Sequence, residues 1–355
     1  MDKSIVFFTK YTSKGPSSRY RTFQYIPYYR KEYEIKTIPF FSDHYLTQLF
    51  SNKSSSLFYL FSRVLLRIFQ VLFKISKKDL VVIEYELIPF FPPLLEYYLK
   101  LRGIKFILDY DDAIFHNYDK SRHQLVQKLF GKKIPTIMKI ATHITTGSPY
   151  LTAYAKLYNN SVTEIPTSVS NSRYMFENEY VENDILNIGW VGSKTTSKNV
   201  IAILDAFKSL ENFVPYKLSL IGFDDSLIPF LKDIKYSIIE WNESSEPIEI
   251  SKFDVGIMPL EDNLFNRGKC GFKLVQYMAC GIPTISTPLE ANVKINRSKK
   301  NLHATTIDEW RKAFIDVSRN RSFFKQVGIE NKLYFQKYYS VESNVVHYLS
   351  IFNNI

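Results

Sequence analysis

The sequence predicts an α/β protein with two domains, each built on a doubly wound, parallel β-sheet. Its 355 residues exceed the roughly 100–200 residues of one average domain. Short runs of β-branched and aromatic residues alternate with longer segments of helical period, which is the order of a parallel sheet with crossover helices. A polar stretch, residues 169–184, has no sustained apolar period and is predicted to be the domain linker.

The first domain is predicted over residues 1–168 and contains six strands. Each is a short run rich in β-branched or aromatic residues, and segments of helical period separate them. They are SIVFFT (4–9), YEIKTIPF (33–40), LVVIEYEL (80–87), KFILDYD (105–111), HITTGS (143–148) and VTEIPT (162–167). Runs that are apolar throughout are typical of a parallel sheet covered on both faces.

The second domain is predicted over residues 185–339 and repeats this scheme with five strands. They are NIGWVGS (187–193), KLSLIG (217–222), YSIIEW (236–241), DVGIMPL (254–260) and PTISTP (283–288). If two such domains face each other, the carboxyl ends of both sheets surround one cleft, which is where open α/β sheets bind ligands. We therefore expect the chemistry in the loops that follow the strands.

The composition indicates an anionic partner. There are 46 lysine and arginine residues against 35 acidic ones, a net charge of +11, which favours a phosphorylated ligand, a lipid surface or nucleic acid. A nucleic-acid binder ranks lowest, because the cations are scattered and no recognition motif is visible. Cys270 and Cys280 lack His or Cys neighbours at metal-ligand spacing and are predicted to be buried, reduced thiols, which fits a cytoplasmic protein.

No segment is expected to cross a membrane. The N-terminus lacks the long apolar region of a secretory signal, and charged residues interrupt the apolar stretch 57–78. In that stretch the polar side chains recur at spacings of four, three, four and three, and so form one narrow helical face: Arg63, Arg67, Gln70, Lys74 and Lys77. The helix is predicted either to pack in the core or to dip into an anionic membrane interface.

The most specific motif spans residues 253–286. It predicts a strand, a basic loop, a helix from about Phe272 to Gly281, and a further strand after Pro283. Helix N-termini and cations both favour anions, so the first turn of this helix with Arg267, Lys269 and Lys273 forms a compact site for a diphosphate. Gln276 lies one turn beyond Lys273 and can bond a sugar or ribose diol. The alternative is a basic surface loop before an ordinary packed helix.

Two further loops follow predicted strands. In residues 187–199 the small residues Gly192 and Ser193 let a phosphate approach the backbone before a helix that begins near Lys198; alone, this is as consistent with a tight turn. In residues 14–21 a serine caps the next helix and the arginines lie at the mouth of the cleft, unless they are merely solvated: Ser17, Ser18, Arg19 and Arg21.

Carboxylates follow two strands of the first domain. Asp109 and Asp111 fit an Asp-x-Asp metal site, whereas Asp111 or Asp112 without metal would orient a hydroxyl or take its proton. The alternative is that one aspartate caps the following helix and the others are solvated. We favour the role without metal, because the phosphate-binding loops lie in the second domain. Glu84 and Glu86 share one face of a strand and reach the same edge, either toward a ligand or as exposed charges.

These motifs together resemble the retaining nucleotide-sugar glycosyltransferases of family 4, which have the two-domain GT-B architecture. The resemblance rests on RGKCGFKLVQYMACGIPTIS, FDVGIMPL, GWVGS, GPSSRYR and DYDDAIF, which occur in the family's order over nearly the whole chain. It implies that the second domain binds the donor without a metal, that the first binds the acceptor, and that a final helix, residues 340–355, returns to the first domain.

The resemblance also assigns roles to individual residues. The family's phosphate-binding lysine falls on Lys198, while Ser193 stands where an arginine is usual and Gln276 where a ribose-binding glutamate is usual. Lys273 and the backbone of Gly271 and Phe272 would face the donor. The acceptor side would comprise Ser17, Ser18, Arg19, Arg21, Glu84, Glu86, Asp111 and Asp112, with Asp111 counted among the catalytic residues.

The function implied is sugar transfer from a nucleotide diphosphate sugar to a glycan or polyprenyl-linked glycan of a bacterial surface polysaccharide, such as a lipopolysaccharide or capsule. Lys198, Lys273 and the helix N-terminus would stabilise the leaving diphosphate. Two alternatives remain: a metal-dependent transferase built on residues 109–112, and a non-catalytic binder of the same fold, suggested by the missing arginine and glutamate.

Overall fold

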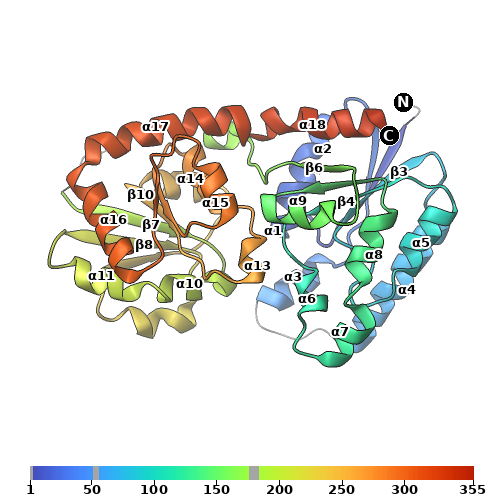
Figure 1. Ribbon diagram of the computed structural model, residues 1–355, viewed down its shortest axis with the longest axis horizontal. Coiled ribbons are helices and arrows are strands. Elements are labelled where there is room, and N and C mark those ends of the chain that lie inside the picture. Colours follow the sequence, from blue (N-terminus) through green and yellow to red (C-terminus); the bar gives the residue numbers. More distant parts are fainter. Residues whose placement is uncertain (1–2, 51–55, 176–183) are drawn as a thin grey trace. The chain divides into compact units, whose positions relative to one another are not determined.

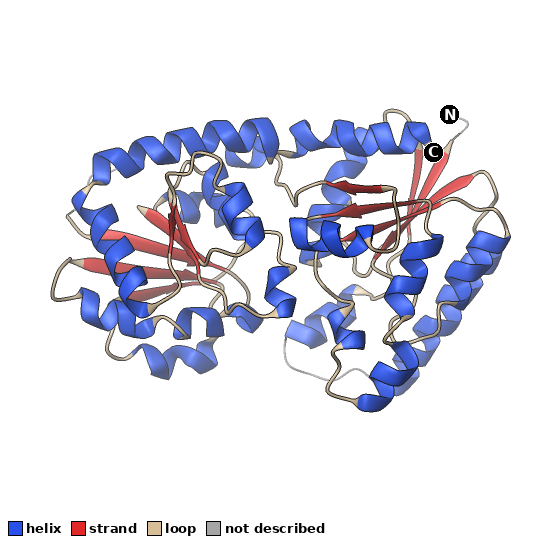
Figure 2. Cartoon of the chain, viewed as in Figure 1, coloured by secondary structure: helices blue, strands red, loops and turns tan. Residues whose placement is uncertain are grey.

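The computed structural model describes residues 3–50, 56–175 and 184–355, and the chain divides into two compact units (Figure 1). The first unit comprises Met1–Thr167, Gly268–Cys270 and Asn344–Ile355, and the second comprises Ser168–Arg267 and Gly271–Ser343. Of the predicted linker, residues 176–183 lie outside the described residues. Each unit contains one six-stranded sheet whose pairings are all parallel (Figure 2).

The sheet of the first unit has the order β2-β1-β3-β4-β5-β6. Its strands are β1 (Ser4–Phe8), β2 (Glu34–Thr37), β3 (Asp79–Glu84), β4 (Phe106–Tyr110), β5 (His143–Thr146) and β6 (Val162–Glu164). All six predicted strands are confirmed. The central strands β1, β3 and β4 are almost entirely buried, as their continuous apolar runs require.

Helices cover both faces of this sheet. They are α1 (Pro16–Arg21), α2 (Ile26–Tyr29), α3 (Asp43–Phe50), α4 (Leu57–Phe73), α5 (Leu94–Leu101), α6 (His116–Asp119), α7 (Gln124–Phe130), α8 (Lys133–Ile140) and α9 (Pro149–Lys156). The steps from β2 through β6 run in one direction across the sheet, so right-handed crossovers place α4, α5, α8 and α9 on the same face. The step from β1 to β2 runs the other way and places α1 and α2 on the opposite face.

The last helix, α18 (Val341–Asn354), packs mainly with the first unit, as the resemblance implies. Its Tyr348 ring meets Tyr25 and Tyr29 edge-on, with centroids 5.0 and 6.2 Å apart, and Phe352 packs against Tyr29 and Phe7. These aromatic contacts fix α18 on the face that carries α2.

The sheet of the second unit has the order β12-β11-β10-β7-β8-β9. Its strands are β7 (Leu186–Val191), β8 (Tyr216–Ile221), β9 (Tyr236–Ile239), β10 (Val255–Met258), β11 (Thr284–Ser286) and β12 (Leu302–His303). The five predicted strands are confirmed. Strand β12 was not predicted, because two residues are too few to show an alternating or continuous apolar pattern.

The helices of the second unit are α10 (Lys198–Ile201), α11 (Leu204–Leu210), α12 (Glu246–Ser251), α13 (Leu264–Arg267), α14 (Phe272–Ala279), α15 (Glu290–Ile295), α16 (Ile307–Arg319) and α17 (Arg321–Tyr338). Helix α16 packs on α11, and α17 packs on α14. The α17 contact is very close at Gly328, where an added Cβ would lie 2.1 Å from the carbonyl oxygen of Gly281. None of the described helices combines the length and the apolar character needed to cross a bilayer.

Candidate functional site

Helix α14 begins and ends where the sequence predicts. Gly271 precedes it with φ 64°, a left-handed conformation, and an added Cβ there would lie 2.3 Å from the Ile295 side chain. Gly281, with φ 73°, follows the helix and allows the turn into β11. The backbone N–H groups of the first turn therefore point out of the carboxyl-end side of the sheet, the side on which β10 ends.

Tyr277 holds α14 against the sheet. Its buried hydroxyl donates to the carbonyl of Ile257 in β10 over 3.0 Å and accepts from the N–H of Val191 in β7 over 3.1 Å. A Cβ on Gly256 would lie 2.4 Å from the Tyr277 ring, so only glycine lets the ring lie on β10. The position of the helix N-terminus is thus fixed by two neighbouring strands.

The turn after β7 lies beside this helix. The Lys273 ammonium is 5.5 Å from the centre of the buried Trp190 ring, which places the first turn of α14 next to the end of β7. A Cβ on Gly192 would lie 2.3 Å from the same ring, so glycine is required in this turn. Ser193 caps a short 3-10 turn that precedes α10, and Lys198, the first residue of α10, is exposed.

The predicted cations are engaged in two different places. Arg267 makes a two-pronged hydrogen bond to Asp262 in the exposed loop before α14, at 2.6 and 3.1 Å. Lys269 belongs to the first unit, where its ammonium lies 2.7 Å from the Asp112 carboxylate. Burial alone would lower the pKa of Lys269. The neighbouring Asp112 carboxylate opposes this effect, and the pKa is raised overall. Lys269 is therefore placed with a carboxylate rather than with Lys273.

Gln276 is not open to a ligand, contrary to the expectation. It is 3% exposed, and its Nε2 donates to Oε1 of Glu246 over 2.7 Å. Glu246 is also buried and accepts from Arg173 over 3.0 Å and from the indole N–H of Trp241. The amide is held by a carboxylate because the helix turns this face inward, which the one-turn spacing from Lys273 could not show.

Arg21 was expected at the mouth of the cleft, and this is wrong. It is 3% exposed, and its guanidinium makes a two-pronged hydrogen bond to Asp109, at 2.9 and 2.5 Å. It also donates to the carbonyl of Ile165 over 2.6 Å. The Asp109 charge and the other partners compensate for burial, and the pKa of Arg21 is raised. This pair ties α1 to β4 and the end of β6.

The same pair contradicts the metal alternative, in which Asp109 and Asp111 share a cation. Both Asp109 oxygens accept from Arg21, and Oδ1 also accepts from Thr145 over 2.5 Å, so Asp109 has no free face for a metal. Within the described residues, no group of three or more His, Cys, Asp or Glu side chains is arranged to hold a metal ion.

Asp111 and Glu84 lie at the carboxyl ends of β4 and β3. Asp111 accepts from the hydroxyl of Tyr85, and burial together with the Asp112 charge raises its pKa. Glu84 is buried and accepts from the Ser18 hydroxyl over 2.6 Å, and burial raises its pKa to about 8. Ser18 is itself buried and therefore supports Glu84 rather than facing a ligand.

The remaining predicted residues of this edge have protein partners. Glu86 forms a buried ion pair with Lys133 and accepts from the Tyr118 hydroxyl over 2.6 Å. Arg19 donates to the carbonyl of Ser13 over 2.9 Å. The Ser17 hydroxyl accepts from Tyr85 over 3.3 Å and is half-buried. The two cysteines are buried thiols, as predicted.

Sequence reasoning missed several polar side chains at these edges: Tyr85, Lys133, Arg173, Trp241 and Glu246. Trp241 is the last residue of a predicted strand, which was a usable signal. Its side chain is 38% exposed, and a Cβ on Gly222 would lie 3.2 Å from the Trp241 Cβ. The burial of Glu246 could not be predicted, because a glutamate in a polar segment is normally expected to be exposed to solvent.

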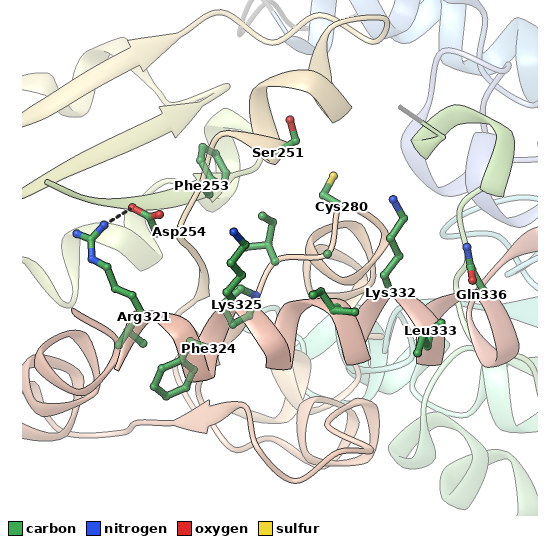
Figure 3. A pocket seen from close by; sticks show the side chains of 15 residues that line it. Ser251, Phe253, Asp254, Cys280, Arg321, Phe324, Lys325, Lys332, Leu333 and Gln336 are labelled. Carbon is green, nitrogen blue, oxygen red and sulfur yellow. Dashed lines mark ion pairs between the residues drawn. The ribbon is translucent and has the colours of Figure 1, made fainter. Parts of the chain in front are cut away.

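A pocket lies elsewhere in the second unit, at the amino ends of β10 and β11. It has a volume of about 330 Å³ and is lined by the turn at Gly281 and by one side of α17 (Figure 3). Arg321 and Asp254, 3.7 Å apart, form an ion pair at one end of it. None of the residues predicted to bind the donor lines this pocket.

The fold is that of solved GT-B glycosyltransferases. The chain is similar to Anabaena Alr3699/HepE in complex with UDP (TM-score 0.73, 9% identity, 99% of this chain and 100% of that chain) and to WaaG, a glycosyltransferase involved in lipopolysaccharide biosynthesis (0.64, 9%, 96% and 98%). It is also similar to an S. aureus TarM mutant in complex with UDP, of which it spans 59% (0.60, 11%, 83% of this chain). No protein-family model and no curated protein matches the sequence.

Proposed function

We propose that the chain is a retaining glycosyltransferase that moves a sugar from a nucleotide diphosphate sugar to a glycan or lipid-linked glycan. The observation that carries the proposal is the arrangement around Lys273: a helix N-terminus fixed by Tyr277, a lysine beside it and a glycine turn at Gly192, all on the carboxyl-end side of one parallel sheet. A helix N-terminus and a cation at such an edge suit a diphosphate.

The donor diphosphate would lie between the first turn of α14 and the turn after β7. Lys273 and the exposed Lys198 would stabilise the charge that develops on the diphosphate as the bond to the sugar breaks, and the amides after Gly271 would add to it. Trp241, partly exposed beside Gly222, offers a ring on which the base can stack. No metal is required in this proposal.

The acceptor would bind at the carboxyl-end side of the first sheet. In the proposed reaction the acceptor hydroxyl attacks the anomeric carbon as the diphosphate leaves, on the same face of the sugar. Asp111 is proposed to orient that hydroxyl and take its proton, which suits a carboxylate whose pKa is raised toward neutrality. Asp112 and Lys269, 2.7 Å apart, flank it.

We also propose a place for the reaction. The acceptor is proposed to belong to bacterial surface polysaccharide synthesis, a lipopolysaccharide or a capsule, and the similarity to WaaG, a glycosyltransferase involved in lipopolysaccharide biosynthesis, supports the first of these. The reaction is proposed to take place at the inner face of the cytoplasmic membrane.

A second candidate is a nucleotide-sugar-binding protein without transferase activity. It is favoured by the residues at two positions. Ser193 and Gln276 stand where the resembled family usually has an arginine and a glutamate, and the Gln276 amide already donates a hydrogen bond to Glu246.

The test is release of the nucleotide from a panel of sugar donors: the diphosphate from UDP, GDP and ADP sugars, and CMP from CMP sugars. Each donor is assayed with and without chelator, and with and without a membrane lipid extract as the source of acceptor. The proposal expects release from one donor, stimulated by the extract, unaffected by chelator and lost in Lys273→Ala. Binding of a nucleotide without any release would support the non-catalytic candidate, and release abolished by chelator would overturn the metal-independent mechanism.

A further inference from the structure

Every exposed residue of α4 is a large hydrophobic one. Seven side chains of this 17-residue helix face outward, and each is between 38% and 84% exposed: Leu57, Phe58, Phe61, Leu65, Leu66, Phe69 and Phe73. Scattered single hydrophobic residues are normal on protein surfaces, whereas a continuous row along a helix is rare on a protein surrounded only by water.

The polar residues of α4 point the other way. Arg67 is 2% exposed, its guanidinium lies 4.5 Å from the centre of the Phe8 ring, and it donates to the carbonyl of Ile38 over 3.2 Å. Arg63 donates to the carbonyl of Pro39 over 2.9 Å, and Gln70 is buried. The usual arrangement of a surface helix is therefore reversed within α4: Arg63, Arg67 and Gln70 of the predicted polar face lie against the protein, whereas Lys74 and Lys77 follow the helix and are exposed.

The apolar row continues onto the next helix. Helix α5 lies on the same face of the sheet, and its Glu96 acts on the pKa of Arg67, which burial lowers to about 9. Figure 1 shows α4 and α5 next to each other. The outer side of α5 adds Leu94 and Leu101, which are 59% and 86% exposed. The apolar surface thus extends over two helices.

The charge of the chain is concentrated in the part that carries this surface. Residues 1–167 contain 24 lysine and arginine residues against 13 acidic ones, a net charge of +11, whereas residues 168–355 contain 22 of each. Three exposed lysines directly follow α4: Lys74, Lys77 and Lys78. Cations beside an apolar helix face complement anionic lipid head groups.

We propose that α4 lies in the surface of an anionic lipid bilayer, with its apolar row in the region between head groups and acyl chains. At about 1.5 Å per residue the helix is about 25 Å long, and its outward row suits a position parallel to the membrane. This inference rests on the proposed function, because an enzyme that acts on a lipid-linked acceptor must reach that acceptor at a membrane. A second copy of the chain fits less well, because two units of charge +11 repel each other.

The experiment is co-flotation of the purified full chain with vesicles of phosphatidylcholine alone or with about one third phosphatidylglycerol. The test variant is Phe61→Gln with Phe69→Gln, whose side chains are 60% and 50% exposed. The matched control is Phe213→Gln with Phe230→Gln in the second unit, which are 58% and 56% exposed. Both variants lose two exposed phenylalanines and leave the charge unchanged.

We expect the wild type and the control to float with the anionic vesicles, and the α4 variant to bind about tenfold or more weakly. Replacing Lys74, Lys77 and Lys78 with glutamine should weaken binding to anionic vesicles and remove its dependence on salt. An unchanged melting temperature shows that each variant is folded.

Several results would overturn the proposal: a wild type that binds no vesicles, equal binding by the α4 variant, or equal binding to neutral and anionic vesicles. A dimer in light scattering that the α4 variant breaks would also overturn it, because the apolar row would then belong to a second copy. Each variant is also tested for nucleotide binding, so a failure at the membrane is distinguished from a failure of the proposed function.

Discussion

Gln276 donates a hydrogen bond to Glu246 over 2.7 Å, and both side chains are buried in the second unit. The bond joins α14, which carries Lys273, to the start of α12. The bond uses the Gln276 amide, so the proposed donor would be held through other groups. The contact explains why an amide rather than a carboxylate stands at this position: a glutamate here would meet the Glu246 carboxylate out of water.

Gln276→Glu is expected to destabilise the protein by about 1–3 kcal/mol at pH 8, because two carboxylates would share a buried site. One of them would then have a raised pKa, so stability should recover as the pH falls toward 5. Thermal unfolding at both pH values measures this. Gln336→Glu, on an exposed position of α17, is the control and should change stability little at either pH.

Lys273→Ala is expected to weaken nucleotide diphosphate binding about tenfold or more, since a charge-assisted bond contributes about 1.5–3 kcal/mol. Lys198→Ala should act in the same direction. In the absence of ligand, the free energy of unfolding should change by less than about 0.5 kcal/mol in either variant. Titration calorimetry measures the affinity, with Lys312→Ala, an exposed position of α16, as the control. If both lysine variants bind the nucleotide as tightly as the wild type, the donor site does not lie at this edge of the sheet.

Arg21→Ala is expected to destabilise the protein by about 3–5 kcal/mol, because it leaves the buried Asp109 carboxylate without its partner. The measurement is urea unfolding, compared with Arg30→Ala, which removes an exposed arginine just after α2. Equal effects of the two substitutions would mean that the Arg21 pair is not structural.

Glu84 should make stability depend on pH. Its pKa is raised to about 8 in the folded protein by burial, so the folded state binds the proton more tightly than the unfolded state does. Its contribution to stability is present in full below a pH of about 4.5 and is lost as the pH rises toward 8, by at most about 1.4 kcal/mol per pH unit. Glu84→Gln should remove this loss. A wild type and variant with parallel stability profiles between pH 5 and 8 would contradict it.

The sequence predicted the elements that have a strong local pattern. Eleven strands and helix α14 with its two glycines were predictable, because continuous apolar runs and glycine or proline stops specify them locally. The direction of single side chains was not. Arg21 and Asp109 are 88 residues apart in sequence, and only the parallel order of the sheet brings them together.

Helix α4 shows the same limit in another form. The spacing predicted a narrow polar face, and its members within the helix, Arg63, Arg67 and Gln70, share one side, but the spacing did not show that this side lies against the protein. The carbonyls of Ile38 and Pro39, which accept from Arg67 and Arg63, are fixed by the preceding strand and loop and leave no trace in the helix sequence.

The measurement that tests the central claim most directly is a thermal-shift screen of the purified protein against UDP, GDP, ADP and CMP and their common sugar conjugates, with and without chelator. A nucleotide diphosphate at about 100 times its dissociation constant stabilises a protein by about 2.7 kcal/mol. We predict that one of them raises the melting temperature equally with and without chelator, and that Lys273→Ala loses the shift. No shift with any nucleotide, or the same shift in Lys273→Ala, would contradict a donor site at the N-terminus of α14.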